Sequence, residues 1–170
     1  METWDLFDER RLSLNKRHQR GRDLNEGEFH IVVEVWTINS RNEVLVTLRD
    51  PRKPDYPDKW ENTGGSVLSG ENSRQGAVRE LREETGIIAS ENELILLGTY
   101  KESKAFVDVY LLHRDIPVEH LTMQDGETVA AKWISVEELD SMILNETLAW
   151  PTGKRLQHVR SAFDEQLRKR

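Results

Sequence analysis

Apolar residues follow two different periods along this chain, so the sequence predicts both strands and helices. Residues 29–38 (FHIVVEVWTI) are rich in β-branched and aromatic types and apolar on nearly both faces, which predicts a central strand covered on both sides. A turn over residues 39–42 leads to a second strand over residues 43–49. Residues 50–59 (DPRKPDYPDK) are charged and rich in proline, and they predict a loop.

The second half of the chain continues this mixture. Residues 93–100 and 105–113 predict two strands joined by a short polar turn. A loop over residues 115–128 separates them from a short strand over residues 129–134. This order does not repeat a strand–helix–strand unit, so the sequence favours a mixed sheet with helices over a purely parallel sheet.

Two helices are predicted near the C-terminus. Ser135 and Glu138 have the spacing of a capping box, which begins a helix that runs to about Leu144. A second helix is predicted over residues 151–168. Its apolar stripe consists of Leu156, Val159, Phe163 and Leu167.

A further helix is predicted within residues 65–87 (GSVLSGENSRQGAVRELREETGI). Ser73 is its predicted N-cap, and Gly86 fits the C′ position, where a left-handed backbone is needed. About three turns of helix lie between these two residues. One arc of the helix is apolar, and the neighbouring arc carries three glutamates.

Glu80, Glu83 and Glu84 form this acidic arc, at the spacing that brings helical side chains together. Carboxylates so close raise each other's pKa unless a cation lies among them. Mg²⁺ prefers oxygen ligands, and a diphosphate brings further oxygens to the same ion. Arg79 lies one turn before Glu83 and within reach of Glu71 if the intervening loop folds back, so we expect Arg79 to orient carboxylates. The alternative is a solvated acidic face with ion pairs such as Arg79 to Glu83.

The complete pattern resembles the Nudix box without departures, in Gly65, Glu71, Arg79, Glu80, Glu83, Glu84 and Gly86. The resemblance covers roughly residues 29–144. It implies an α/β fold, the Nudix α/β/α sandwich with a mixed β-sheet between helices. Residues 1–170 would form a single Nudix hydrolase domain, with residues 1–28 as an N-terminal extension packed on it. The implied activity is metal-dependent cleavage of a pyrophosphate bond, in a nucleoside diphosphate linked to another group X or in a related small diphosphate compound. The implied cofactor is Mg²⁺ or Mn²⁺.

Residue roles follow from the resemblance alone. The carbonyl of Gly64 and the carboxylates of Glu83 and Glu84 correspond to metal ligands, and Glu80 corresponds to a general base or further ligand. Many members add a carboxylate from a loop before a strand that ends in tryptophan, and Glu127 has that position. The implied catalytic residues are Glu80, Glu84 and Arg79, and the implied metal ligands are Gly64, Glu80, Glu83, Glu84 and Glu127. The alternative is that Glu127 is an ordinary loop charge. Glu102 and Asp108 are weaker candidates for the same additional ligand.

The proline-rich loop and its flanks offer candidate substrate-binding residues. Arg49 and Lys53 could meet phosphates, although scattered solvated charges are the alternative for each. Tyr56 is the better candidate for stacking on a base or ring. Trp36 lies in the central-strand pattern, which places it in the core.

The segments at residues 4–6 (WDL), 29–30 (FH) and 62–66 (NTGGS) form a second pattern. This pattern resembles the Nudix branch that contains isopentenyl diphosphate isomerases. Those enzymes use a cysteine near the position of Gly64 and a metal-binding histidine near that of Ser66, and this chain has neither. His18 and His30 match two further ligand histidines only superficially, because the spacing differs. We therefore expect that the chain does not isomerise by that chemistry, and an isomerase-like enzyme is kept only as an alternative function. A non-catalytic nucleotide-binding sensor is another, although such proteins typically have a degraded box.

The composition of the chain limits the classes of molecule that it is expected to bind. The chain has 170 residues and a net charge of −7, and it has no basic patch that suits duplex nucleic acid. It has no cysteine, which excludes disulfides and a thiol nucleophile. No apolar run approaches membrane-spanning length, and the first residues lack the pattern of a signal peptide. We therefore expect a cytoplasmic protein that binds a small diphosphate substrate and no membrane. Because many relatives are dimers, a homodimer is compatible with the resemblance.

Overall fold

The computed structural model describes residues 2–169. Its strands are β1 (Thr3–Phe7), β2 (Ser13–Gln19), β3 (His30–Ile38), β4 (Val44–Arg49), β5 (Trp60–Glu61), β6 (Thr63–Ser66), β7 (Ile95–Lys101), β8 (Ala105–His113) and β9 (Thr128–Ile134). Its α-helices are α1 (Ser73–Thr85), α2 (Val136–Leu144) and α3 (Trp150–Arg168). Two short 3₁₀ helices occupy Glu91–Glu93 and Val118–His120.

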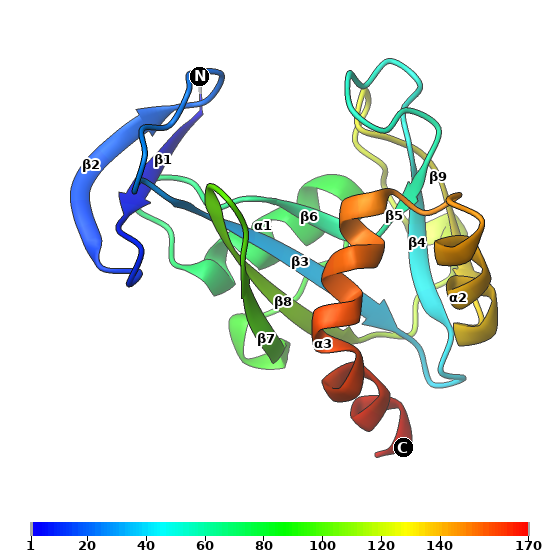
Figure 1. The fold of residues 1–170 in the computed structure, drawn as a ribbon. Coiled ribbons are helices and arrows are strands. Elements are labelled where there is room, and N and C mark those ends of the chain that lie inside the picture. The colour runs from blue at the N-terminus through cyan, green and yellow to red at the C-terminus, as the bar shows by residue number, and fades with distance from the viewer. Residues whose placement is uncertain (1, 170) are drawn as a thin grey trace.

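A seven-stranded mixed sheet forms the centre of the molecule (Figure 1). Its strands follow the order β5-β4-β3-β8-β7, while β6 also pairs with β3 and β9 pairs with β4. β3 runs parallel to β8 along its whole length and antiparallel to β4 and β6. The apolar segment of residues 29–38 is therefore central, as predicted, and Val33, Trp36 and Ile38 are fully buried in it.

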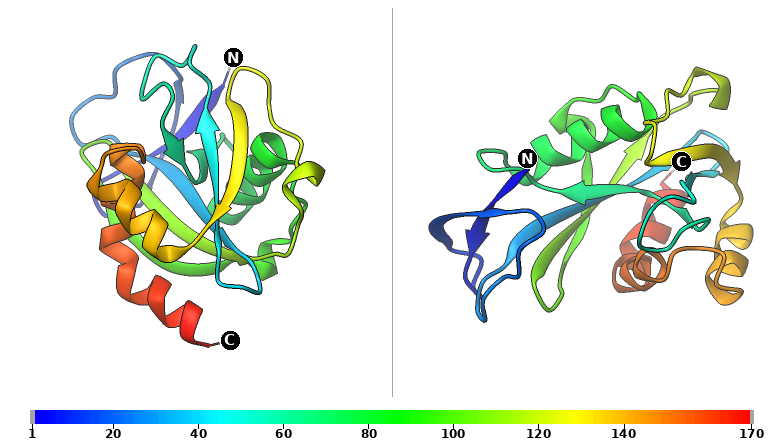
Figure 2. Two further views of the ribbon diagram at one scale, coloured as in Figure 1. Left: turned by 90° about the vertical axis from the view of Figure 1, so that its right-hand side faces the viewer. Right: turned by 90° about the horizontal axis from the view of Figure 1, so that it is seen from above.

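Helices cover both faces of the sheet (Figure 2). On one face, Val33 packs in a core with Leu81 of α1. On the other face, Trp36 packs in a second core with Leu139 of α2 and Phe163 of α3. This is the predicted α/β/α sandwich, with a mixed sheet between the helices. Within the described residues, no helix combines the length and the apolar character needed to cross a bilayer.

The helix α1 ends where the sequence predicts but begins differently. Its N-cap is Asn72, not Ser73, because the Asn72 side chain accepts the Gln75 N–H at 3.0 Å and the Gln75 side chain accepts the Asn72 N–H at 2.8 Å. The Ser73 hydroxyl instead donates to Asp108. Gly86 has φ 73°, the left-handed backbone expected after the last turn, and its N–H donates to the helix.

Other predicted boundaries also shift. The capping box of α2 is only half formed, since Ser135 accepts the Glu138 N–H at 3.1 Å while the Glu138 carboxylate pairs with Lys132 at 2.7 Å. The last helix begins at Trp150, one residue before its predicted start. The strand predicted from residue 93 begins at Ile95, because the residues before it form a 3₁₀ turn.

Residues 3–19 form an antiparallel hairpin of β1 and β2, which the sequence pattern did not reveal (Figure 1). The ring of Trp4 stacks on that of His30 in β3, with 4.1 Å between ring centroids. Arg11 at the end of the hairpin donates to the buried carboxylate of Asp108 in β8 at 2.7 Å. The hairpin is thus attached by this aromatic stack, by a part-buried ion pair and by two backbone hydrogen bonds between Phe7 and Phe29, at 2.8 and 2.9 Å. The short strands β5 and β6 were also missed.

Candidate active site

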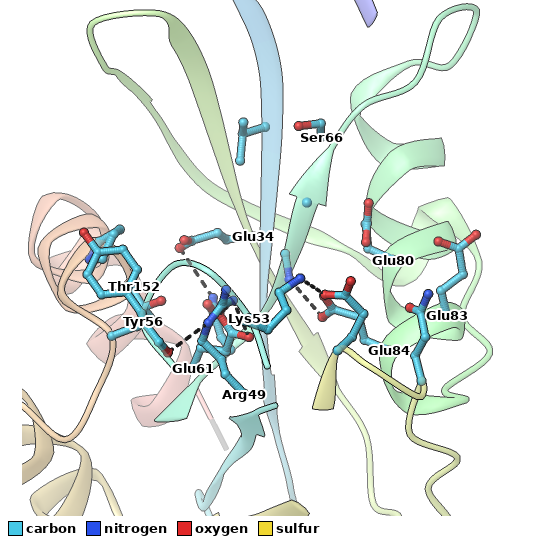
Figure 3. A pocket seen from close by; sticks show the side chains of 18 of the residues that line it. Glu34, Arg49, Lys53, Tyr56, Glu61, Ser66, Glu80, Glu83, Glu84 and Thr152 are labelled. Atoms are coloured by element: carbon cyan, nitrogen blue, oxygen red, sulfur yellow. Dashed lines mark hydrogen bonds and ion pairs between the residues drawn. The ribbon is translucent and has the colours of Figure 1, made fainter. Parts of the chain in front are cut away.

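A cavity of about 310 Å³ opens between α1, the loop of residues 50–59 and the first turns of α3. In Figure 3, Glu80, Glu83 and Glu84 project from α1 on one wall, and Tyr56 and Thr152 lie on the opposite wall. The acidic lining residues are Glu2, Glu34, Glu61, Glu80, Glu83, Glu84 and Glu127. The basic lining residues are Arg20, Arg49, Lys53 and Arg155. An excess of carboxylates in one cavity favours a bound cation.

Arg79 organises the carboxylates of α1. Its guanidinium donates to both oxygens of Glu71 at 2.8 and 3.1 Å, which confirms the contact expected from the folded-back loop. It also donates to Glu80 at 2.8 Å, to Glu83 at 3.0 Å and to the carbonyl of Ser66 at 2.9 Å. Arg79 therefore links α1 to the loop before it and fixes the positions of two carboxylates.

Two adjacent glycines in β6 allow the sheet and α1 to approach closely. A Cβ atom at Gly64 would lie 2.8 Å from the carbonyl oxygen of Val33 in β3. A side chain at Gly65 would collide with the carboxylate of Glu80. The backbone of β3 therefore requires glycine at position 64, whereas a side chain at position 65 would displace the carboxylate of Glu80.

Glu84 is a buried carboxylate without a cationic partner among the described residues. Its side chain accepts one hydrogen bond, from the N–H of Gly64 at 3.2 Å, and the residue is 8% exposed. Burial raises its pKa well above the usual range, and the nearby charges of Glu61 and Glu80 raise it further. Burial likewise raises the pKa of Glu80, which the charge of Arg79 opposes. A cation beside Glu84 would offset this cost of ionisation.

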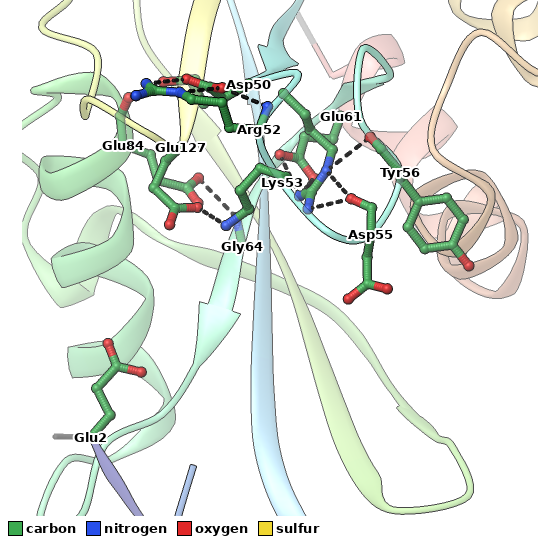
Figure 4. A network of polar contacts seen from close by, with 12 residues as sticks. Glu2, Asp50, Arg52, Lys53, Asp55, Tyr56, Glu61, Gly64, Glu84 and Glu127 are labelled. Atoms are coloured by element: carbon green, nitrogen blue, oxygen red, sulfur yellow. Dashed lines mark hydrogen bonds and ion pairs between the residues drawn. The ribbon is translucent and has the colours of Figure 1, made fainter. Parts of the chain in front are cut away.

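Two ion pairs fix the wall made by the proline-rich loop (Figure 4). Lys53 pairs with Glu127, which joins this loop to the loop before β9. Arg49 donates to both carboxylate oxygens of Glu61 at 2.9 and 2.7 Å and to the backbone carbonyl of Asp55 at 2.8 Å. The loop therefore has a defined position relative to the glutamates.

A comparison with known protein families decides the identity, since a family model for the NUDIX domain matches residues 28–158. This chain belongs to the Nudix hydrolase family. The match includes β3, the whole Nudix box and the first turns of α3, which together build the cavity.

Individual relatives agree with this assignment. A Nudix hydrolase of Listeria monocytogenes is 34% identical over 143 residues, which are 84% of this chain and 85% of that protein. The CTP pyrophosphohydrolase of Escherichia coli is 35% identical over 104 residues, 61% of this chain and 76% of that protein. A crystal structure of a Deinococcus radiodurans protein has a TM-score of 0.77 at 24% identity, over 95% of this chain and 99% of that one, which supports the fold. The family and its named hydrolases support the predicted pyrophosphohydrolase.

The Nudix box provides oxygen donors that fit a divalent cation. Glu80, Glu83 and Glu84 line one cavity with Gly64, and Glu84 has no cationic partner in the described part of the chain. Within residues 2–169, no three acidic or histidine side chains already converge as a ligand set. Arg79 holds Glu80 and Glu83 through ion pairs, so a cation bound there would have to compete with its guanidinium.

The remaining predicted residues fall into two groups. Glu127, Arg49, Lys53 and Tyr56 all line the cavity, but the first three are already engaged in the ion pairs of the loop wall. The weaker candidates lie elsewhere. Glu102 and Asp108 lie outside the cavity lining, where Glu102 pairs with Arg155 and Asp108 pairs with Arg11. His18 and His30 also lie outside it, and both stack on the ring of Trp4.

Sequence reasoning missed a second polar network on the wall opposite α1. Arg155 of α3 donates to Glu34 of β3 at 2.9 Å and to Glu102 at 2.7 and 2.8 Å. Burial raises the pKa of Glu34 to about 7, and the charge of Arg155 opposes that shift. The signal was present in part, since Glu34 is the only acidic residue in the apolar segment of residues 29–38. Nothing in the sequence points to its partner 121 residues away.

Proposed function

We propose that this Nudix hydrolase cleaves a pyrophosphate bond in a nucleoside diphosphate linked to another group, with Mg²⁺ or Mn²⁺ as cofactor. The proposed ligands are the carbonyl of Gly64 and the carboxylates of Glu80, Glu83 and Glu84. Glu127 would join them once its ion pair with Lys53 opens. The name of the related CTP pyrophosphohydrolase supports a nucleotide as the substrate.

The observation that carries this proposal is the environment of the Glu84 carboxylate. Its carboxylate is buried, has one N–H donor and no cationic side chain among the described residues, and faces further carboxylates. Such a group is costly to ionise unless a cation binds beside it. The same geometry in a purely structural helix would be destabilising without any compensating contact.

The residues of the cavity divide the chemistry among them. Glu80 or Glu84 would orient or deprotonate the water that attacks one phosphorus in line. Both carboxylates line the cavity that would hold the diphosphate, which is the observation that supports this role. Arg79 would act as a positioning residue through Glu80 and Glu83. When bound, the divalent cation would neutralise charge that develops on the phosphate oxygens.

Substrate contacts are proposed for the loop wall. Lys53 and Arg49 are the cations of this wall that would meet phosphates, and Tyr56 would stack on a ring. Because Arg49 already binds Glu61 and the loop carbonyls, Lys53 is the freer of the two. A cytoplasmic location and a homodimer stay predictions from the sequence.

The test is turnover of a panel of nucleoside diphosphate derivatives with Mg²⁺ or Mn²⁺, by the wild type and by Glu84→Gln. We expect Glu84→Gln to reduce turnover by about 10²–10⁴-fold with an unchanged fold by circular dichroism. Glu119→Gln, which changes an exposed glutamate outside the cavity, is the matched control and should retain full activity.

Full activity of Glu84→Gln would refute the assigned site. A wild type that binds a member of the panel tightly without turning it over would instead support the sensor alternative. Conversion of isopentenyl diphosphate to its dimethylallyl isomer would support the isomerase alternative, which the absence of cysteine disfavours.

A further inference from the structure

A second cavity, of about 630 Å³, adjoins the proposed active site and shares Tyr56 and Ala149 with it. The first turn of α3 separates the two cavities, since Pro151 and Thr152 line the first one and Trp150 lines the second. The second cavity also includes the end of α2 and the segment that joins α2 to α3. The two cavities therefore border each other at Tyr56 and Ala149.

The second cavity gathers large apolar side chains that are exposed to solvent. Leu144 is 85% exposed, Trp150 is 62% exposed and Tyr56 is 42% exposed. Exposed apolar side chains that occur singly need no explanation, but a cluster in a groove marks a binding surface. Among the described residues, Trp150 is the only tryptophan that is exposed. Its position on the first turn of α3 places an exposed aromatic ring in the second cavity.

The groove is already held in place by hydrogen bonds. The N–H of Trp60 in β5 donates to the carbonyl of Thr147 at 3.0 Å, and the N–H of Ala149 donates back to the carbonyl of Trp60 at 2.8 Å. The ammonium of Lys59 donates to the carbonyl of Glu146 at 2.7 Å. Because the wall is tied to the sheet, a ligand would not have to order it on binding.

Two cations give the groove a charge opposite to that of the whole protein. Lys59 and Lys154 line it with a single acidic residue, Glu146, in a chain with a net charge of −7. The ammonium of Lys154 lies 4.7 Å from the ring centroid of Trp150. A planar ring with polar edges and an attached phosphate chain matches an aromatic surface next to lysines better than a purely aliphatic chain does.

We infer that this second cavity binds the base of the nucleoside diphosphate substrate, with Trp150 and Tyr56 as its stacking surfaces. This inference rests on the proposed function, which places the diphosphate in the first cavity. Tyr56 then contacts the substrate where the sugar passes from one cavity to the other. Trp150, which the sequence analysis did not single out, becomes a residue that selects substrates with an aromatic base over diphosphates without one.

Steady-state kinetics of Trp150 variants test the inference. Loss of one base-stacking contact corresponds to about a 5- to 150-fold change in affinity. We expect Trp150→Ala to raise KM for the best nucleoside diphosphate derivative within this range and to change kcat less. Trp150→Phe should restore most of the affinity, whereas Trp150→Leu should not. Ile88→Ala, which removes an exposed side chain on another surface, is the control and should leave KM unchanged.

A binding experiment separates this inference from the proposed function. A nucleoside monophosphate is titrated in EDTA into the wild type and into Trp150→Phe, with tryptophan fluorescence as the signal. Base stacking on Trp150 predicts quenching in the wild type that is largely lost in the variant. If the wild type shows quenching but no turnover of any substrate, the base site is supported and the hydrolase proposal is refuted.

Three results would overturn the inference. One is turnover by the wild type with an unchanged KM in Trp150→Ala. Another is equal KM values for Trp150→Leu and Trp150→Phe, which would assign the groove to an alkyl group. The third is a shift in the sedimentation coefficient of Trp150→Ala with no change in KM, which would make the groove a contact between copies of the chain.

Discussion

Replacement of Arg79 by lysine separates the charge of this residue from its geometry. In the structure the guanidinium donates five hydrogen bonds, two to Glu71 and one each to Glu80, Glu83 and the carbonyl of Ser66. A lysine ammonium has three donors on a flexible stem, so Arg79→Lys loses at least two of the five bonds. The positive charge stays near the Nudix box, but the planar group that joins the loop to the helix is removed.

The expected cost follows from the bonds lost. A hydrogen bond to a charged group contributes about 1.5–3 kcal/mol. The Arg79 side chain is 14% exposed, so water compensates only part of the loss. The contact with Glu83 is the most exposed of the set, so its loss should cost less than that of a buried bond. We therefore expect the free energy of unfolding to fall by about 2–4 kcal/mol, which is less than the sum for two fully buried bonds.

Urea unfolding in EDTA at pH 7 measures this change without any contribution from a bound cation. The matched control is Arg82→Lys on the same helix, where the side chain is exposed, and its effect should stay within about 0.5 kcal/mol. Equal stability of the two variants would refute the view that Arg79 holds the box together. Turnover adds a second readout, since a displaced Glu80 should lower kcat more than it changes KM.

Two further predictions concern the packing at Gly65 and the pH dependence of stability. Gly65→Ala places a methyl group against the carboxylate of Glu80, so turnover should fall by about 10²-fold while the protein remains folded; full activity would show that the position of Glu80 is not critical. Burial lowers the pKa of His30 to about 4, so an unfolded chain binds this proton below about pH 6.5 and the native state does not. Stability from this group is complete above that pH and is lost as the pH falls towards 4. His30→Phe, which keeps a ring against Trp4, should therefore show a smaller loss of thermal stability than the wild type between pH 6.5 and pH 4.

The box and the central strand could be predicted from sequence because local spacing determines them. The glutamate arc and the position of Gly86 follow from helix geometry over a few turns, and the contact from Arg79 to Glu71 requires only that the short loop before the helix folds back. The N-cap was wrong by one residue because Asn72 and Ser73 both suit that position. Tertiary contacts decide between them, since Ser73 is bound to Asp108 in a distant strand.

The missed elements have weaker local signals. The strand β6 has the sequence TGGS, and glycine disfavours strands in general, so only its pairing with β3 reveals it. The strand β2 carries mostly exposed polar residues, and its partner β1 is short. The network of Arg155 with Glu34 depends on residues far apart in the chain. The base-binding groove is also beyond local patterns, because it forms where α2, α3 and one loop meet.

The ion pair between Lys53 and Glu127 has a thermodynamic consequence for the affinities of the two proposed ligands, the metal ion and the substrate. Each partner neutralises the other, so in the proposed site Glu127 would become available to a metal ion when Lys53 is released, and Lys53 would become available to a phosphate by the same event. Either ligand therefore removes part of the cost that the other would meet. By linkage, the metal ion and the anionic substrate must raise each other's affinity by the same factor. A single part-buried ion pair would thereby make two binding events cooperative.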